Sequence, residues 1–247
     1  TSIENEWLCL KVLQAYGLRV ANAEIGVFGD RKALVVERFD RVRDGAQGPL
    51  LRLMQEDFCQ ALGLPADTKY ESDGGPGMGT ICERLLQSSA RDSDLETFWQ
   101  AQVLFAMLAA TDGHAKNFSI RLFAGGSFRL TPLYDVVSAW PIIGKGADQL
   151  AWQNARLAMA FRDKNVHYHL AGIRARQLLA TAERQCRIPL RRAQALLREI
   201  VERTPRVIAE VGARLPPGFP ASVSDSIFAG MERSADRFVG NDVASAG

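Results

Sequence analysis

The sequence contains 247 residues, of which 47% are hydrophobic and 23% are charged, a composition typical of a globular protein with a large buried core. Its 30 Lys and Arg residues nearly balance its 28 Asp and Glu residues, and the formal net charge of +2 is too close to neutral to imply a polyanion as the main partner. Because the sequence has neither an apolar run of roughly 20 residues nor the start of a signal peptide, we expect a cytoplasmic protein without a membrane partner.

The first part of the chain is predicted to form a helix followed by a β hairpin. Apolar residues follow helical spacing over residues 3–16, and Gly17 is suited to end that helix. Two β-prone runs, residues 23–28 and 32–39, then flank the turn sequence GD. The polar stretch DRVRDGAQGP, residues 40–49, is predicted to be a loop that separates two parts of the chain.

The middle and the end of the chain are predicted to be mainly helical. Helical windows cover residues 55–63, 78–89 and 94–111, and from Val103 onward the last window is apolar on nearly every side, which indicates a helix inside the core. Two short strands around the turn AGGS come next, and the pattern is helical again from about residue 173 to the end. These elements predict an α+β fold in which helix dominates.

The stretch AATDGHAKNFSIRLFAGGSFRLTPLYDVVSAW, residues 109–140, carries the candidate catalytic residues. Asp112 lies at the exit of the buried helix, Asn117 follows five residues later, and Asp135 follows the second predicted hairpin. A carboxylate can accept the proton of a substrate hydroxyl, and an amide oxygen and a second carboxylate are hard oxygen ligands for Mg²⁺. This spacing occurs in kinases and indicates phosphoryl transfer, while TDG, KN and YD also fit an alternative in which they form only structural turns.

Longer motifs around these residues resemble one protein family. The segments ALVVERFDR, QEDFCQALGLP, KYESDGGPG, ATDGHAKNFS and LTPLYDVVSAWP, in that order, resemble the C-terminal part of HipA, the family of serine/threonine kinase toxins of bacterial HipBA toxin–antitoxin modules. The resemblance runs from about residue 2 to about residue 238. It implies a protein-kinase-like C-lobe that is preceded by a hinge hairpin, a remnant of the N-lobe.

The resemblance assigns roles to residues of the catalytic stretch. It implies that Asp112 is the catalytic base facing a substrate serine hydroxyl, and that Asn117 and Asp135 hold Mg²⁺ on the phosphates of ATP. His114 lies two residues after the base, where many eukaryotic-like kinases keep a phosphate-contacting Lys. The resemblance therefore implies a phosphate contact for His114.

The resemblance also implies that VERFD is the hinge between two kinase lobes. In this reading the backbone at Glu37 and Phe39 contacts the adenine edge of ATP, and Asp40 lies near the ribose. The Phe39 side chain equally fits a place in the core. Because backbone groups would bind the adenine, a hinge can be identified although the roles of its side chains stay open.

Substrate and partners are implied by the same resemblance. HipA proteins phosphorylate a serine of glutamyl-tRNA synthetase, which slows growth and leads to persistence, and they bind the DNA-binding antitoxin HipB. We therefore expect this chain to bind a HipB-like antitoxin and to contact DNA only indirectly, through that antitoxin. Nothing in the residues themselves selects glutamyl-tRNA synthetase as the substrate.

Two parts of the family's kinase body are missing from the sequence before the hinge: a Gly-rich loop and a strand Lys that pairs with the ATP phosphates. Lys11 belongs to the predicted opening helix and Lys32 to the predicted hairpin turn. We therefore divide the chain into an N-lobe remnant, residues 1–42, and a helical kinase-like C-lobe, residues 43–247. The chain by itself is expected to be weakly active or inactive, because phosphoryl transfer depends on positioning and charge neutralisation.

Two alternatives to an active protein kinase stay open. The first is a catalytically incomplete pseudokinase fragment that acts as an antitoxin- or DNA-binding module, since residues 187–206 are rich in Arg, although the interleaved Glu residues equally fit a solvated helix face. The second is a small-molecule phosphotransferase, in which the His usually precedes the Asp, whereas here it follows it as DGH. The hairpin before the hinge is expected to expose a strand edge and to promote self-association.

Overall fold

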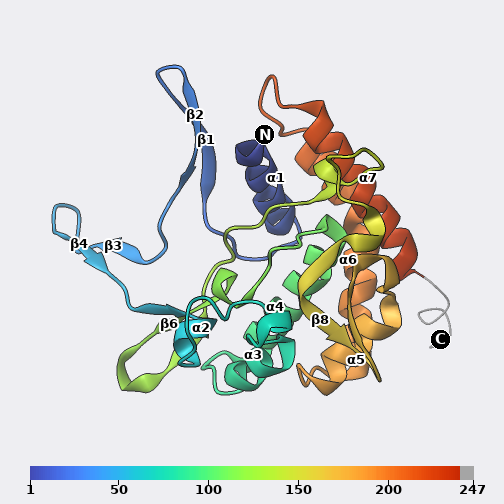
Figure 1. The fold of residues 1–247 in the computed structure, drawn as a ribbon. Helices are drawn as coiled ribbons and strands as arrows, with labels where there is room; N and C mark the ends of the chain where they lie inside the picture. Colours follow the sequence, from blue (N-terminus) through green and yellow to red (C-terminus); the bar gives the residue numbers. More distant parts are fainter. Residues whose placement is uncertain (240–247) are drawn as a thin grey trace.

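The computed structural model describes residues 1–239, and these residues form the expected α+β fold in which helices dominate. The helices pack together on one side of the molecule and the strands form small, separate sheets (Figure 1). The helices are α1 (Ser2–Ala15), α2 (Phe58–Ala61), α3 (Met78–Leu85), α4 (Arg91–Leu108), α5 (Ala175–Arg184), α6 (Leu190–Gly212) and α7 (Ala221–Phe238). None of the helices within residues 1–239 is both long and apolar enough to cross a membrane.

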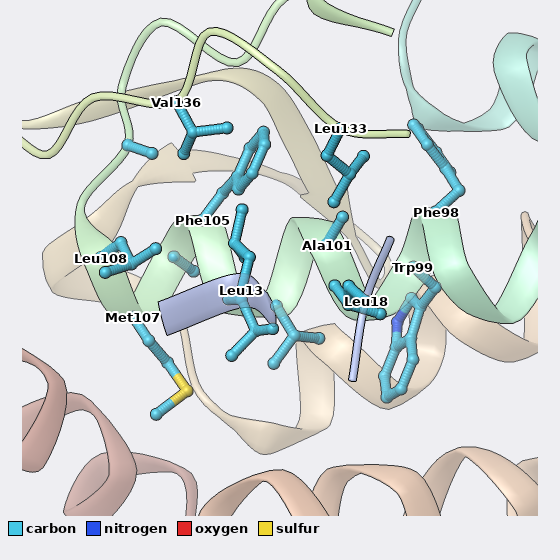
Figure 2. Packing of buried hydrophobic residues seen from close by; sticks show 14 of the residues in the cluster. Leu13, Leu18, Phe98, Trp99, Ala101, Phe105, Met107, Leu108, Leu133 and Val136 are labelled. Carbon is cyan, nitrogen blue, oxygen red and sulfur yellow. The ribbon is translucent and has the colours of Figure 1, made fainter. Parts of the chain in front are cut away.

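Helix α4 lies at the centre of the core, as its apolar sequence predicts. Every residue from Val103 to Ala110 is buried, so this half of the helix contacts protein on all sides. Figure 2 shows Phe98, Trp99 and Phe105 projecting from α4 among side chains of other segments. Burying an aromatic or aliphatic side chain of this size stabilises a fold by about 1.5–3 kcal/mol. The exit of α4, where the candidate catalytic residues begin, is therefore anchored in the hydrophobic core.

Helix α1 shares this core although it belongs to the predicted N-lobe remnant. Its buried side chains join the hydrophobic cluster around α4, and the helix packs on α6 and α7. The Arg203 guanidinium of α6 donates to the carbonyl oxygens of Ala15 (2.8 Å) and Tyr16 (3.2 Å) at the C-terminal end of α1. The proposed division at residue 42 stays a prediction, and the last residues of its second part, 240–247, lie outside the described residues.

Two β hairpins follow α1 and project from the helical body (Figure 1). The first confirms the predicted hairpin, with Gly29 at positive φ in its turn. The second hairpin includes most of the predicted polar loop, residues 40–49. The residues before and after its turn pair as antiparallel strands. The sequence of the loop contains too few apolar residues to reveal this pairing. The strands are β1 (Ala23–Phe28), β2 (Arg31–Val36), β3 (Arg41–Arg43) and β4 (Leu50–Arg52).

The helix predicted at residues 55–63 begins later than expected. Residues 55–57 form strand β5 (Gln55–Asp57), which pairs with β6 (Ser119–Leu122), and β6 in turn pairs with β7 (Phe128–Leu130). The Asp57 carboxylate accepts from the backbone N–H of Gln60 (2.9 Å), while the Gln60 side chain accepts from the N–H of Asp57 (3.0 Å). This capping box fixes the first helical residue at Phe58.

A further pair of strands was not anticipated from the sequence. Strand β8 (Arg156–Arg162) pairs with β9 (Val166–His169), and β8 packs on α5. The residues of β8 from Leu157 to Phe161 are all buried, so the polar and apolar alternation that reveals a half-exposed strand is absent. The other predicted helices at 78–89, 94–111 and beyond residue 173 are present with ends shifted by a few residues.

Candidate active site

The segment after α4 is built so that Asp112 leaves the core and faces solvent. Ala109 ends the helix in the left-handed conformation (φ 49°), and the chain then turns under Gly113. A Cβ atom on Gly113 would lie 2.5 Å from the Phe105 ring, so only glycine allows this close approach. The Asp112 side chain, next to this buried glycine, is 64% exposed and is accessible to a substrate.

His114 and Asn117 form the buried half of the same loop. A short 3₁₀ turn, residues Ala115–Asn117, brings the Asn117 amide back over the chain, where its oxygen accepts from the His114 backbone N–H (3.3 Å). The His114 ring is buried, and this burial lowers the pKa of its imidazole, so His114 is neutral at pH 7. Its Nδ1 atom is buried and has no hydrogen-bond partner among the described residues. The geometry therefore offers a neutral imidazole, 3.9 Å from the Asp112 carboxylate, in place of a cationic group.

Asp135 meets Asn117 across the loop. The Asn117 amide nitrogen donates to the Asp135 carboxylate (2.5 Å), which connects two residues that are 18 positions apart. Asp135 has φ 56°, in the left-handed region that costs a non-glycine residue free energy and that clusters at functional sites. The preceding Tyr134 hydroxyl donates to the carbonyl oxygen of Lys116 (2.8 Å) and holds the Asp135 segment against the catalytic loop.

Asn117 and Asp135 are residue types that can hold Mg²⁺ together with a nucleotide, and their role as metal ligands stays a prediction. No group of three His, Cys, Asp or Glu side chains within residues 1–239 could form an all-protein metal cage. Mg²⁺ in phosphoryl-transfer sites is held by one or two protein oxygens together with phosphate oxygens and water. Asp135 offers an exposed carboxylate, whereas the Asn117 amide turns its nitrogen toward Asp135 and its oxygen toward the His114 N–H, so the amide has to rotate to offer that oxygen to a metal ion.

The hinge residues predicted for adenine recognition are held by polar contacts of their own. The Glu37 backbone N–H donates to the Asn22 carbonyl oxygen (2.8 Å). The Asp40 carboxylate is buried and accepts two hydrogen bonds from Arg38 (2.8 and 2.7 Å) and a further one from Arg41. The Arg38 hydrogen bonds in particular keep the pKa of Asp40 below its ordinary value. Asp40 therefore stabilises the hinge, and its contact with a ribose stays a prediction.

The hinge and the catalytic segment meet through two aromatic rings. The Phe39 ring lies 5.7 Å from the ring of Tyr134, the residue directly before Asp135. Phe39 is half-buried, which agrees with either the hinge or the packing role predicted for it. The structure thus brings Asp112, His114, Asn117 and Asp135 into one loop cluster and places the hinge beside it.

Three further residues at this site carried no recognisable signal in the sequence. The Tyr70 hydroxyl donates to the Asp112 carboxylate (2.5 Å), and the Lys116 ammonium pairs with Asp57 (2.8 Å) and ties the catalytic loop to β5. Glu6 of α1 is half-buried, and this burial together with the nearby charge of Asp135 raises the pKa of its carboxyl. Each contact joins residues more than 40 positions apart, so spacing along the chain could not have revealed it.

Comparison with known proteins places these features in one family. The family model described as the HipA-like C-terminal domain matches residues 1–208. A serine/threonine-protein kinase toxin HipA from Shewanella oneidensis is 33% identical over 224 residues, which cover 86% of this chain and 49% of that protein. The protein Y4mE from Sinorhizobium fredii is 43% identical over 136 residues, which cover 55% of this chain and 32% of that protein. The matched part therefore spans a third to a half of these relatives.

Solved structures agree with the sequence comparison. The Shewanella oneidensis HipA, in a complex with HipB and its operator DNA, has a TM-score of 0.83 at 28% identity and covers 96% of this chain and 56% of its own. A proinflammatory kinase from Helicobacter pylori, CtkA, has a TM-score of 0.60 at 11% identity and covers 97% of this chain and 81% of its own. The second likeness shows that the fold is that of a kinase, as the resemblance implied.

Proposed function

This chain belongs to the HipA-like C-terminal domain family, and we propose that it carries the catalytic base and the metal ligands of a HipA-like protein kinase. The reaction is transfer of the γ-phosphate of Mg·ATP to a serine or threonine hydroxyl of a protein. The observation that supports it best is the chain of contacts that joins these residues: Asn117 donates to Asp135 (2.5 Å) and accepts from the His114 N–H (3.3 Å), and the His114 ring lies 3.9 Å from the exposed Asp112 carboxylate.

Each residue has a distinct part in the proposed mechanism. The Asp112 carboxylate accepts the hydrogen bond of the acceptor hydroxyl and then its proton as the oxygen bonds to phosphorus. Asn117 and Asp135 would hold Mg²⁺, which neutralises phosphate charge when it is bound. The neutral His114 has a ring N–H to donate to a phosphate oxygen. These roles explain why one loop holds both exposed and buried polar groups.

The hinge offers a backbone donor for the adenine of ATP. No backbone hydrogen bond from the Phe39 N–H is found within residues 1–239, whereas the neighbouring Glu37 N–H is already used by Asn22. An unused N–H at this position suits the ring nitrogen of an adenine edge. Phe39, with its ring against Tyr134, then links nucleotide binding to the metal-binding Asp135.

The substrate and partners belong to the same proposal. HipB is part of the structure of the Shewanella oneidensis relative, which supports a HipB-like antitoxin as partner of this chain and DNA as an indirect one. Glutamyl-tRNA synthetase as substrate, growth arrest and persistence as outcome, and a cytoplasmic location follow from the family resemblance alone. Because the chain matches only part of its relatives, these properties are proposed for the protein that contains it.

The alternative of a DNA-binding module receives less support from the Arg-rich helix α6. Arg192 makes two hydrogen bonds to Glu96 (2.8 and 2.7 Å), and Arg203 caps α1 and pairs with Glu199 (2.9 Å). These guanidinium groups have structural partners, as a solvated and packed helix face requires. A module that binds antitoxin without catalysis stays open as a prediction, since it needs none of the residues discussed above.

Calorimetric titration with Mg·ATP tests the proposed nucleotide site. We expect binding in the millimolar range or tighter, lost in Asp135→Ala and kept in Asp148→Ala, which removes an exposed carboxylate that is not part of the proposed site. In the longer protein that contains this chain, transfer of labelled γ-phosphate to casein is expected to fall about 10²- to 10⁴-fold in Asp112→Ala, the usual contribution of a positioned base. Equal binding by wild type and Asp135→Ala would contradict the proposed metal ligand.

A further inference from the structure

The residues of the loop itself do not fix the orientation of the carboxylate of the proposed base, Asp112. Asp112 is 64% exposed, and a carboxylate so accessible to water rotates freely unless a neighbour holds it. Among the side chains of residues 1–239, the Tyr70 hydroxyl donates a hydrogen bond to the Asp112 Oδ1 atom (2.5 Å), and no other hydrogen bond to this carboxylate is found. Tyr70 therefore determines how the Asp112 carboxylate points.

The Tyr70 ring itself contacts two neighbouring side chains. The edge of the His114 ring packs against it, with centroids 5.1 Å apart and planes at 79°. The Lys69 ammonium lies 5.1 Å from the centroid of the same ring. Because the His114 ring is buried in the core, the phenol is positioned by the same structure that positions the catalytic loop.

The segment that carries Tyr70 is anchored through the next residue. The Glu71 carboxylate accepts from the Ala160 backbone N–H (2.7 Å) and from the Arg162 guanidinium, both in β8. The Gly75 N–H donates back to the Tyr70 carbonyl oxygen (2.8 Å), which closes a tight turn after the tyrosine. The unanticipated strand β8 thus has a role, because it fixes the tyrosine that contacts the catalytic base.

The arrangement leaves one oxygen of the base unoccupied by protein. Oδ1 of Asp112 accepts from Tyr70 and faces the His114 ring at 3.9 Å, whereas Oδ2 accepts no hydrogen bond from the described residues. We propose that Tyr70 is a positioning residue that holds Oδ1 and presents Oδ2 to the acceptor hydroxyl of the protein substrate. This inference rests on the proposed kinase function.

The acid–base state of the phenol agrees with this role. The hydrogen bond to Asp112, together with burial, raises the pKa of Tyr70 to about 12. The phenol consequently keeps its proton throughout the physiological pH range and remains a donor to the carboxylate while the site works.

Steady-state kinetics with Tyr70→Phe measures the positioning effect. The variant keeps the ring against His114 and removes only the hydroxyl, so we expect kcat for phosphate transfer to casein by the longer protein that contains this chain to fall about 10-fold or more, with KM for ATP unchanged. Tyr16→Phe is the matched control, because it also removes a single hydrogen-bonded hydroxyl, which contacts Thr204 of α6 (2.8 Å) and not the loop. Unchanged kcat in Tyr70→Phe, or an equal loss in both variants, would overturn the proposal.

A second measurement separates this proposal from the kinase function itself. The ¹³Cζ resonance of Tyr70, assigned by its absence in Tyr70→Phe, reports the hydrogen bond without any turnover. We expect the chemical shift of this carbon to change in Asp112→Ala and to remain unchanged in Asp148→Ala. If this chemical shift changes in Asp112→Ala but the longer wild-type protein transfers no phosphate, the proposed kinase function is wrong and the contact between Tyr70 and Asp112 has only a structural role. If the chemical shift does not change, the contact is absent and Tyr70 does not position the base.

Discussion

The catalytic loop and the two projecting hairpins differ in how this chain supports them. The loop at residues 112–117 rests on the aromatic cluster of α4, and its buried members are fully enclosed. The hairpins instead place large apolar side chains in solvent: Val27, Phe28, Val35, Val36, Val42, Leu50 and Leu51. The proposed catalytic residues thus lie on a loop that the core supports, whereas the region around the proposed nucleotide hinge is only partly covered.

This difference shows which parts of the proposed site are supported by contacts within this chain. The proposed base, the proposed positioning tyrosine and the two proposed metal ligands depend on contacts that the described residues supply among themselves. The predicted hinge is held by the Arg38 and Asp40 pair. In the strands before it, Ile25 and Leu34 pack against the core, whereas Val27 and Val35 are exposed. Substitutions should therefore cost most near α4 and least in the hairpins.

The largest effect is expected for Phe105→Ala in α4. The Phe105 ring is buried, packs on Phe118 (5.6 Å between centroids) and lies against Gly113, so truncation leaves a cavity beneath the catalytic loop. We expect a loss of about 3–5 kcal/mol in the free energy of unfolding, measured by urea denaturation. Phe123→Ala, at a half-exposed ring outside the core, should cost far less. Equal losses would show that α4 does not dominate stability.

A smaller effect that links packing to catalysis is expected for Gly113→Ala. The added methyl group meets the Phe105 ring at 2.5 Å, so either the ring or the Asp112 segment must shift, at a cost of about 1–3 kcal/mol. Phosphate transfer should fall as well, because Asp112 is the adjacent residue. The double variant with Phe105→Leu should recover part of the lost activity. If the double variant recovers no activity, the packing of Gly113 against Phe105 does not control the position of the loop that carries Asp112.

In the hinge, Asp40→Asn is expected to cost about 1 kcal/mol at pH 7, since Arg38 is largely exposed and screened by water. The pKa of Asp40 lies below its ordinary value, so its contribution is present above that ordinary value and is lost as pH falls through the folded-state pKa. The stability difference between wild type and variant should therefore shrink below about pH 4. A difference that grows with acidity would contradict the ion pair.

The smallest effect on stability is expected for Val27→Ser in β1. Its side chain is 68% exposed, so the free energy of unfolding should change by less than about 0.5 kcal/mol. Self-association at high protein concentration should weaken, because the hairpin edge becomes more polar. Val166→Ser in β9, an exposed valine of another hairpin, serves as control in sedimentation velocity. A clean wild-type monomer would show that the hairpin does not promote association.

The sequence predicted those parts of the fold that depend on local pattern. The helices α1 and α4, the first hairpin and the helical C-terminal part follow from apolar spacing and turn residues, and the structure confirms them. Strand β8 was missed because both of its faces are buried, and β5 was taken for helix because its partner β6 lies more than 60 residues away. Strand pairing over such distances leaves no periodic signal.

The sequence by itself determined the candidates for chemistry, since the types and spacing of Asp112, His114, Asn117 and Asp135 and the motifs around them indicate a HipA-like kinase. Only the tertiary structure decided how these groups are held. The contact of the Tyr70 hydroxyl with Asp112 arises because the fold brings two distant segments together, and the strained backbone of Asp135 arises because the fold imposes its φ angle. Spacing specifies which groups can react, and packing fixes the direction in which each one points.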